Sequence, residues 1–216
     1  MRFGPVQRVQ LLQAQVAKRK VHTLASLVGA MNAAATQDLR TVQVLPTLER
    51  VLGNAPNAFD AQLLQRLESW RAAGASRLDL DGDGKIDDQG AAIMDAAWPL
   101  LADSVLRPRV GALTDRLKTL ISVDDPASSG GSSYYGAWYS YVERQLTTPG
   151  LDPAPLWAAL DAAGRKLAAQ QGPDPGQWHA DATKERITFG SLPLTARWTN
   201  RPTFQQVITF SSHRPR

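Results

Sequence analysis

The stretch Gly172-Pro173-Asp174-Pro175-Gly176 divides this 216-residue chain into two parts with different side-chain patterns. Before it, apolar residues recur three and four positions apart, which predicts helices. After it, short runs of β-branched and aromatic residues, each bounded by Gly, Pro or Ser, predict two or three strands. Two or three strands do not make a stable sheet alone. We therefore expect them to pair with strands from residues outside this chain. The sequence therefore predicts an α+β fold, mostly helical, with a bundle-like helical region over residues 1–176 and C-terminal strands over residues 177–216.

Turn and capping residues divide the helical region into short helices. Thr23 is a suitable N-cap for the second helix, and Pro46 is expected either to kink the third helix or to mark its true start. Pro99 and Pro108 are expected to break the helix that follows the acidic loop at residues 79–88. Residues 126–133 are rich in Ser and Gly, which predicts a flexible linker.

Composition excludes several classes of protein. The chain is 43% hydrophobic and 20% charged, as globular proteins are, and it has no cysteine, which excludes disulfides and thiolate metal sites. No apolar run approaches the ~18–20 residues that span a bilayer, so we expect no membrane segment. The net charge is +4, but the only tight basic run is Lys18-Arg19-Lys20, so we expect no nucleic-acid binding. The first seven residues lack the apolar block of a signal peptide.

An acidic loop over residues 79–88 matches a calcium-binding loop at several positions. With Asp79 as the first ligand, Asp81, Asp83 and Asp87 occupy the third, fifth and ninth positions, and the Lys85 carbonyl occupies the seventh. The twelfth position, where a bidentate Glu is expected, is a glycine. Two interpretations therefore stay open: a weak or structural calcium site, or a turn in which an aspartate caps the following helix.

All four tyrosines lie in the segment between residues 134 and 141. On a helix, Tyr134 and Trp138 share one face, and Tyr135 lies on another. Beside a Gly/Ser linker these three side chains are candidates for lining an apolar substrate pocket. The alternative is a helix held on both sides within the core.

A polar stretch near the C-terminus, Arg197 to Phe204, places Asn200 and Arg201 just after a predicted strand. The amide of an asparagine is a neutral hydrogen-bond donor that can stabilise a developing oxyanion. The alternative is an ordinary turn, since Asn and Pro are common in turns. The chain shows no self-contained catalytic set of residues.

Three stretches in succession resemble the C-terminal part of the catalytic β chain of the penicillin acylase family. The first runs from Arg8 through Gln37-Asp38-Leu39-Arg40 to Leu48, and the second is the acidic loop with the helix that follows it. The third is Trp198-Thr199-Asn200-Arg201-Pro202-Thr203-Phe204 together with residues 207–210. Their order along the chain, more than any single motif, carries the resemblance.

The resemblance implies an N-terminal nucleophile hydrolase whose strands belong to a larger sheet. In that family a serine exposed by self-cleavage attacks an amide bond, and its own α-amine is the base. The implied substrate is a small N-acylated amine, such as a β-lactam or an acyl-homoserine lactone, and no cofactor is needed for catalysis. Asn200 matches the oxyanion-hole asparagine, and Arg214 is the nearest match to an arginine of the same network.

The departures from the family pattern concern the missing nucleophile. The chain begins with Met1, and no serine precedes the helical region. We therefore expect the α chain and the N-terminal part of the β chain to be partners, and the isolated chain to be inactive. The resemblance implies a periplasmic or extracellular parent protein with a role in antibiotic biosynthesis or degradation. The competing hypothesis is a non-catalytic helical binding or structural module that calcium stabilises.

Overall fold

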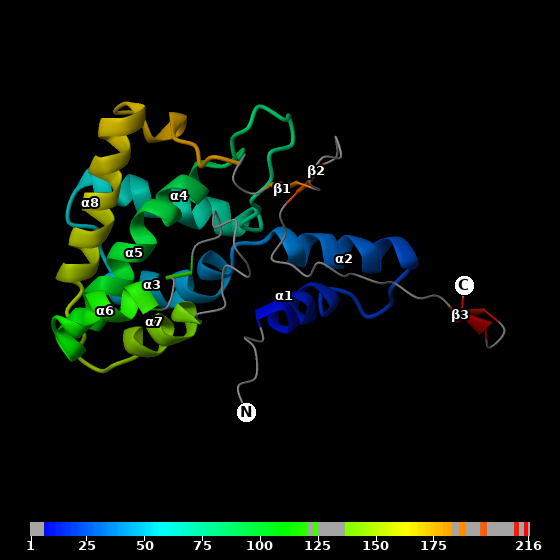
Figure 1. The fold of residues 1–216 in the computed structure, drawn as a ribbon, viewed down its shortest axis with the longest axis horizontal. Helices are drawn as coiled ribbons and strands as arrows, with labels where there is room; N and C mark the ends of the chain where they lie inside the picture. Colours follow the sequence, from blue (N-terminus) through cyan, green and yellow to red (C-terminus); the bar gives the residue numbers. More distant parts are fainter. Residues whose placement is uncertain are drawn as a thin grey trace.

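Eight α-helices make up most of the chain that the structure describes. This computed structural model describes residues 7–120, 123–124 and 137–182, and the backbone of four short strands beyond them (Figure 1). The α-helices are α1 (Gln7–Val16), α2 (Leu24–Thr36), α3 (Leu45–Leu52), α4 (Ala58–Ala72), α5 (Gln89–Val110), α6 (Leu113–Leu120), α7 (Trp138–Leu146) and α8 (Ala154–Gln171). A π-helix, η1 (Arg40–Val44), precedes α3, and a 3₁₀ turn, η2 (Pro175–Gln177), follows α8.

Helix α5 lies at the centre of the helical body and packs against α4, α6, α7 and α8 (Figure 1). Its side chains are buried on several faces, including those of Ile93, Trp98 and Leu101. Helix α8 contributes Leu160 and Ala163 to the same core. Among the described helices, none is long and apolar enough to cross a membrane.

The breaks expected at Pro99 and Pro108 do not occur, because α5 continues through both prolines. A proline inside a helix removes one backbone hydrogen bond and costs ~3 kcal/mol. The side chains of Trp98 and Leu101, on either side of Pro99, are 1% and 2% exposed. Burying two such side chains contributes about 1.5–3 kcal/mol each, which is enough to keep the helix continuous. The expectation failed because it considered local propensity without tertiary packing.

Pro46 marks the start of α3, one of the two alternatives that the sequence left open. The backbone N–H of Leu45 donates to the carbonyl of Arg40, five residues earlier, as a π-helical turn requires. This wider turn comes directly before the proline, which has no N–H to continue an α-helical pattern.

Helices α1 and α2 form an antiparallel hairpin that lies beside the body of α3 to α8 (Figure 1). Thr23 caps α2 as expected: its hydroxyl accepts the Ser26 N–H, and the Ser26 hydroxyl accepts the Thr23 N–H. We call residues Gln7–Thr36 the α1–α2 hairpin.

The expected α+β fold with two or three C-terminal strands in a larger sheet is wrong for the described residues. Apart from helices, loops and two isolated bridges, they hold only two separate pairs of very short strands. Strand β1 (Arg186–Thr188) pairs with β2 (Thr195–Arg197), and β3 (Phe210–Ser211) pairs with β4 (Arg214–Pro215), both antiparallel. Pairs of two or three residues have too few hydrogen bonds and too little apolar area to form a sheet. The β-branched composition of this region indicated strand propensity, which does not by itself create a sheet.

Glycine allows α4 and α5 to approach closely. A Cβ on Gly90, in the first turn of α5, would lie 2.5 Å from the Cβ of Trp70 on α4. Trp70 is a buried side chain, 1% exposed, and has no room to move aside. Gly29, on the exposed part of α2, has no atom within 4 Å of such a Cβ.

We therefore expect opposite effects from the same substitution at these two glycines. Gly90→Ala should destabilise the chain by about 1–3 kcal/mol through overpacking. Gly29→Ala should stabilise it by about 0.5–1 kcal/mol, because alanine favours the helix. Urea unfolding monitored by circular dichroism measures both values. A neutral Gly90→Ala variant would contradict the close packing of α4 on α5.

Candidate functional site

A network of four charged side chains lies where η1, the α4–α5 connection and α5 meet. The Asp38 carboxylate accepts hydrogen bonds from Arg40, with Nε at 3.1 Å and Nη2 at 2.5 Å, and from Nη1 of Arg77 at 3.2 Å. The Asp95 carboxylate bridges the same two arginines. Its Oδ1 lies 2.5 Å from Arg40 Nη2 and its Oδ2 lies 2.8 Å from Arg77 Nη2. We call these four residues the charge network.

Backbone pairing between two distant segments brings the charge network together. The N–H of Asp38 donates to the carbonyl of Ala75 at 2.8 Å, and the N–H of Arg77 donates to the carbonyl of Thr36 at 2.9 Å. These bonds form a short antiparallel bridge between the end of α2 and the segment after α4. Asp95, on α5, then closes the network from the third side.

The charge network is deeply buried. The side chains of Asp38, Arg40 and Arg77 are at most 3% exposed, and that of Asp95 is 24% exposed. Burial alone would raise the pKa of Asp38, but the guanidiniums of Arg40 and Arg77 outweigh it, so its pKa lies below the usual value. Arg40 also lies over the ring of Trp98, 5.9 Å from its centroid. The two arginines therefore hold the Asp38 carboxylate in its ionised form.

Asp124 connects the charge network to the start of α7. Its backbone carbonyl accepts a hydrogen bond from Arg40 Nη1 at 3.4 Å, and its carboxylate accepts the N–H groups of Trp138 at 3.3 Å and Tyr139 at 2.5 Å. Ala137, just before α7, provides no capping side chain, so Asp124 caps this helix from a distance. Burial raises the pKa of Asp124 to about 7, although both N–H groups and Arg40 lower it.

Sequence reasoning missed the charge network. Asp38, Arg40 and Asp95 were noted only as parts of the stretches that resemble the penicillin acylase family. Arg77 was not singled out. One signal was available: Asp38 and Arg40, two residues apart, are the only Asp, Glu, Lys or Arg residues between positions 21 and 48. Charged residues within a buried helical segment are normally paired. That signal predicts an ion pair, although it does not identify Arg77 or Asp95 as partners.

The aspartate loop, residues 79–88, folds around its first acidic side chain. The buried Asp79 carboxylate accepts the N–H of Gly82 at 2.7 Å and that of Gly84 at 3.1 Å. One carboxylate oxygen from each of Asp79, Asp81 and Asp87 lies within 4.8 Å of the others. Three of the predicted calcium ligands therefore converge on one point.

Asp83, the predicted fifth ligand, does not belong to this group. Asp83 accepts the N–H of Lys85 at 2.8 Å, and the exposed Lys85 ammonium lies 3.9 Å from the same carboxylate. Asp88 caps α5 by accepting the Gly90 N–H at 2.9 Å, as the turn interpretation expected. Because Trp70 packs against Gly90, no larger side chain fits at the twelfth position of the loop. The donors are the hard oxygens that calcium prefers, but without a bidentate Glu the predicted site is weak.

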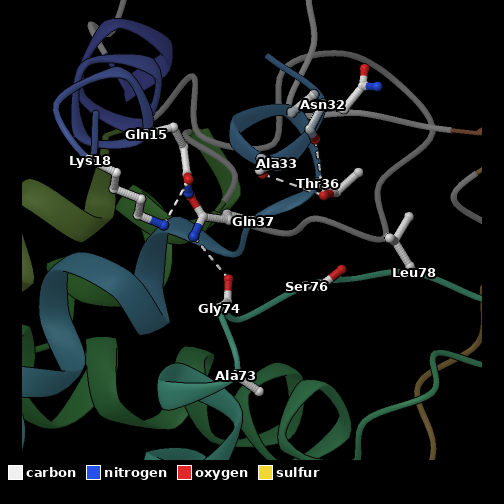
Figure 2. Close-up of a pocket in the computed structure, with 11 residues that line it drawn as sticks. Gln15, Lys18, Asn32, Ala33, Thr36, Gln37, Ala73, Gly74, Ser76 and Leu78 are labelled. Carbon is white, nitrogen blue, oxygen red and sulfur yellow. Dashed lines mark hydrogen bonds between the residues drawn. The ribbon is translucent and has the colours of Figure 1, made fainter. Parts of the chain in front are cut away.

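A cavity of about 580 Å³ opens between the α1–α2 hairpin and residues 73–78 (Figure 2). A row of hydrogen bonds crosses one wall of it. Lys18 donates to the side-chain oxygen of Gln15 at 2.7 Å, Gln15 donates to that of Gln37 at 2.7 Å, and Gln37 donates to the Gly74 carbonyl at 2.9 Å. The row joins α1 and the residue that follows α2 to the segment that carries Arg77.

The other predicted site residues lie mostly outside the described part of the chain. Asn200, Tyr134 and Tyr135 lie outside it, and the structure describes only the backbone of Arg214, which pairs with Ser211. Trp138 is described: it is 6% exposed and packs edge-on against Tyr141, with ring centroids 6.5 Å apart. These site assignments remain predictions.

Comparisons with known proteins agree on one family. The sequence profile described as Penicillin amidase matches residues 1–205. A solved structure titled thermostable penicillin G acylase from Alcaligenes faecalis is similar, with a TM-score of 0.62 and 15% sequence identity. The similarity covers 94% of this chain and 40% of that chain, so this chain spans less than half the length of the relative. No curated protein sequence matches it.

The convergence of Asp79, Asp81 and Asp87 makes the calcium prediction testable. If the loop binds calcium with a dissociation constant of ~1 mM, 10 mM calcium should stabilise the chain by about 1.4 kcal/mol and raise its melting temperature by ~3–5 °C. The double variant Asp81→Asn/Asp87→Asn should lose this rise, and magnesium at the same concentration serves as the control. An unchanged melting temperature would leave the loop as a metal-free turn.

Proposed function

This chain belongs to the penicillin amidase family, and we propose that it forms part of an amidohydrolase that cleaves the amide bond of an N-acylated substrate. The observation that carries the proposal is the family match over residues 1–205, which includes Asn200. The chain spans 40% of the length of the solved relative, so we assign the activity to an assembled enzyme and not to these 216 residues alone.

In the proposed reaction, this chain supplies a hydrogen-bond donor. A serine at the N-terminus of the β chain, outside these residues, attacks the substrate carbonyl, and its α-amine accepts the proton. An α-amine has a pKa of about 7.7–8.0, so an appreciable fraction of it is unprotonated near neutral pH. As the carbonyl oxygen gains negative charge, the side-chain amide of Asn200 donates a hydrogen bond to it. Arg214 is proposed to belong to the same network.

The helical part of the chain is proposed to support this chemistry indirectly. The charge network fixes the end of α2, the segment after α4 and α5 relative to one another. Trp138, with Tyr134 and Tyr135, is proposed to line the pocket for the acyl group of a β-lactam, an acyl-homoserine lactone or a similar small amide. The parent protein is proposed to act in the periplasm or outside the cell.

Reconstitution tests the proposal. We expect the chain, co-expressed with the α chain and the N-terminal part of the β chain, to hydrolyse a chromogenic acyl anilide, and the isolated chain not to. Asn200→Ala should lower kcat by about 10²–10³-fold, because it removes an oxyanion-hole donor. Asn54→Ala, at an exposed turn after α3, is the matched control and should keep full activity.

Two results would contradict this proposal. Full activity of the Asn200→Ala enzyme would exclude Asn200 from the oxyanion hole. Absence of hydrolysis from a correctly assembled complex, with a panel of acyl chain lengths, would favour the non-catalytic helical module instead.

A further inference from the structure

The start of α7 is held by a residue that lies outside the helix. Its first two N–H groups, those of Trp138 and Tyr139, both donate to the carboxylate of Asp124, at 3.3 Å and 2.5 Å. A helix usually takes its cap from the residue directly before its first turn, but Ala137 has no side-chain acceptor. A carboxylate 14 residues before Trp138 therefore takes the place of a local cap.

The backbone directly before α7 has a conformation that alanine rarely adopts. Ala137 has a φ of 55° and a ψ of 32°, which is the left-handed region. A side chain makes this region unfavourable, because its Cβ comes too close to the following carbonyl oxygen. Such strain persists where surrounding contacts fix the backbone, and it is frequent at binding sites. The two hydrogen bonds to Asp124 are contacts of this kind, since they fix the two residues that follow Ala137.

Asp124 is itself fixed in place by the charge network. It is 1% exposed, and its backbone carbonyl accepts a hydrogen bond from Nη1 of Arg40 at 3.4 Å. A second bond ties the next turn of α7 to η1, because Nε2 of Gln43 donates to Oε2 of Glu143 at 2.7 Å. Helix α7 also packs against η1 and α3. The first two turns of α7 are therefore both fastened to the same part of the chain.

The side chains of α7 show what this arrangement holds in place. Tyr139, Val142 and Leu146 are buried and recur three and four residues apart, so they anchor the inner face of the helix. Trp138 lies on the flank of that face, edge-on to the half-buried Tyr141, with ring centroids 6.5 Å apart. Two aromatic rings at the edge of the core offer apolar surface to an acyl chain. The position of Trp138 depends on the first turn of α7.

We propose that Asp124 is a positioning residue of the amidase: by holding the strained start of α7, it keeps Trp138 in contact with the acyl group and so helps to select the acyl chain. This inference rests on the proposed function, in which Trp138 lines the acyl pocket. Asp124 acts through Trp138 and contacts no reacting atom. Contacts with the acyl chain lie away from the bond that breaks, so they are equal in the substrate and the transition state. Their loss raises KM and leaves kcat unchanged.

Kinetics of the assembled enzyme test this role, with neutral acyl anilides of increasing chain length as substrates. The enzyme is this chain co-expressed with the α chain and the N-terminal part of the β chain. Asp124→Asn keeps one acceptor oxygen and Asp124→Ala keeps none. We expect KM to rise about threefold in the first and about tenfold in the second, with kcat within about twofold of the wild type.

Asn57→Ala is the matched control. The Asn57 side chain caps α4 by accepting the Asp60 N–H at 3.0 Å, and α4 carries no residue proposed for the pocket. This variant loses a helix cap of the same kind, so it should lose stability and keep the KM of the wild type.

Two further variants separate the strain from the aromatic ring. Ala137→Gly relieves the left-handed backbone, so in the Asp124→Asn enzyme it should bring KM back toward the wild-type value. Trp138→Phe leaves Asp124 and both N–H groups in place but has a smaller ring, so it should raise KM for short acyl chains and favour longer ones. Hydrogen exchange supplies an independent measurement: the backbone amides of Trp138 and Tyr139 should exchange faster in the assembled Asp124→Asn enzyme than in the wild type.

The outcomes separate this inference from the function on which it rests. Unchanged KM in both Asp124 variants, a lower kcat at unchanged KM, or an equal rise of KM in Asn57→Ala would overturn the positioning role and leave the proposed function intact. If neither Asp124 variant assembles, Trp138→Phe decides, and an unchanged KM at every acyl length overturns the inference. If the assembled wild-type enzyme hydrolyses none of the anilides, the proposed function fails together with the inference.

Discussion

The buried pairing of two arginines with two aspartates is the interaction on which the rest of this structure depends. Taking four charges out of water costs several kcal/mol per ion, so such a group persists only when each charge is compensated. Arg40 and Arg77 each contact both Asp38 and Asp95, so the charges cancel within the charge network. Loss of one partner would leave a buried charge uncompensated. Apolar side chains do not require a specific partner in this way.

The charge network also sets where the outlying parts of the chain lie. Asp38 lies two residues after the α1–α2 hairpin, and Arg77 lies two residues before the aspartate loop. Through Asp124, the network reaches the start of α7 as well. The features proposed to bind calcium and to line a pocket therefore both adjoin this one junction. The proposed catalysis depends on this junction for placement.

Local features were predictable from sequence, and long-range ones were not. The Thr23 cap and the start of α3 at Pro46, one of the two alternatives that the sequence left open, follow from residues adjacent in the chain. The spacing of aspartates indicated a loop whose carboxylates converge, but it did not show that Asp83 points elsewhere. Continuity of α5 through its prolines, the absence of an extended sheet in the described residues and the partners of Asp38 all depend on segments distant in sequence. No local pattern specifies such partners.

A double-mutant cycle across the charge network tests this account most directly. The free energy of unfolding would be measured by urea titration for Asp38→Asn, Arg77→Met and the double variant. If the network acts as one unit, each single substitution should cost about 3–5 kcal/mol, and the double variant should cost clearly less than the sum of the two. Single costs below about 1 kcal/mol that add independently would show that the helices are held by apolar packing alone, and would contradict the account.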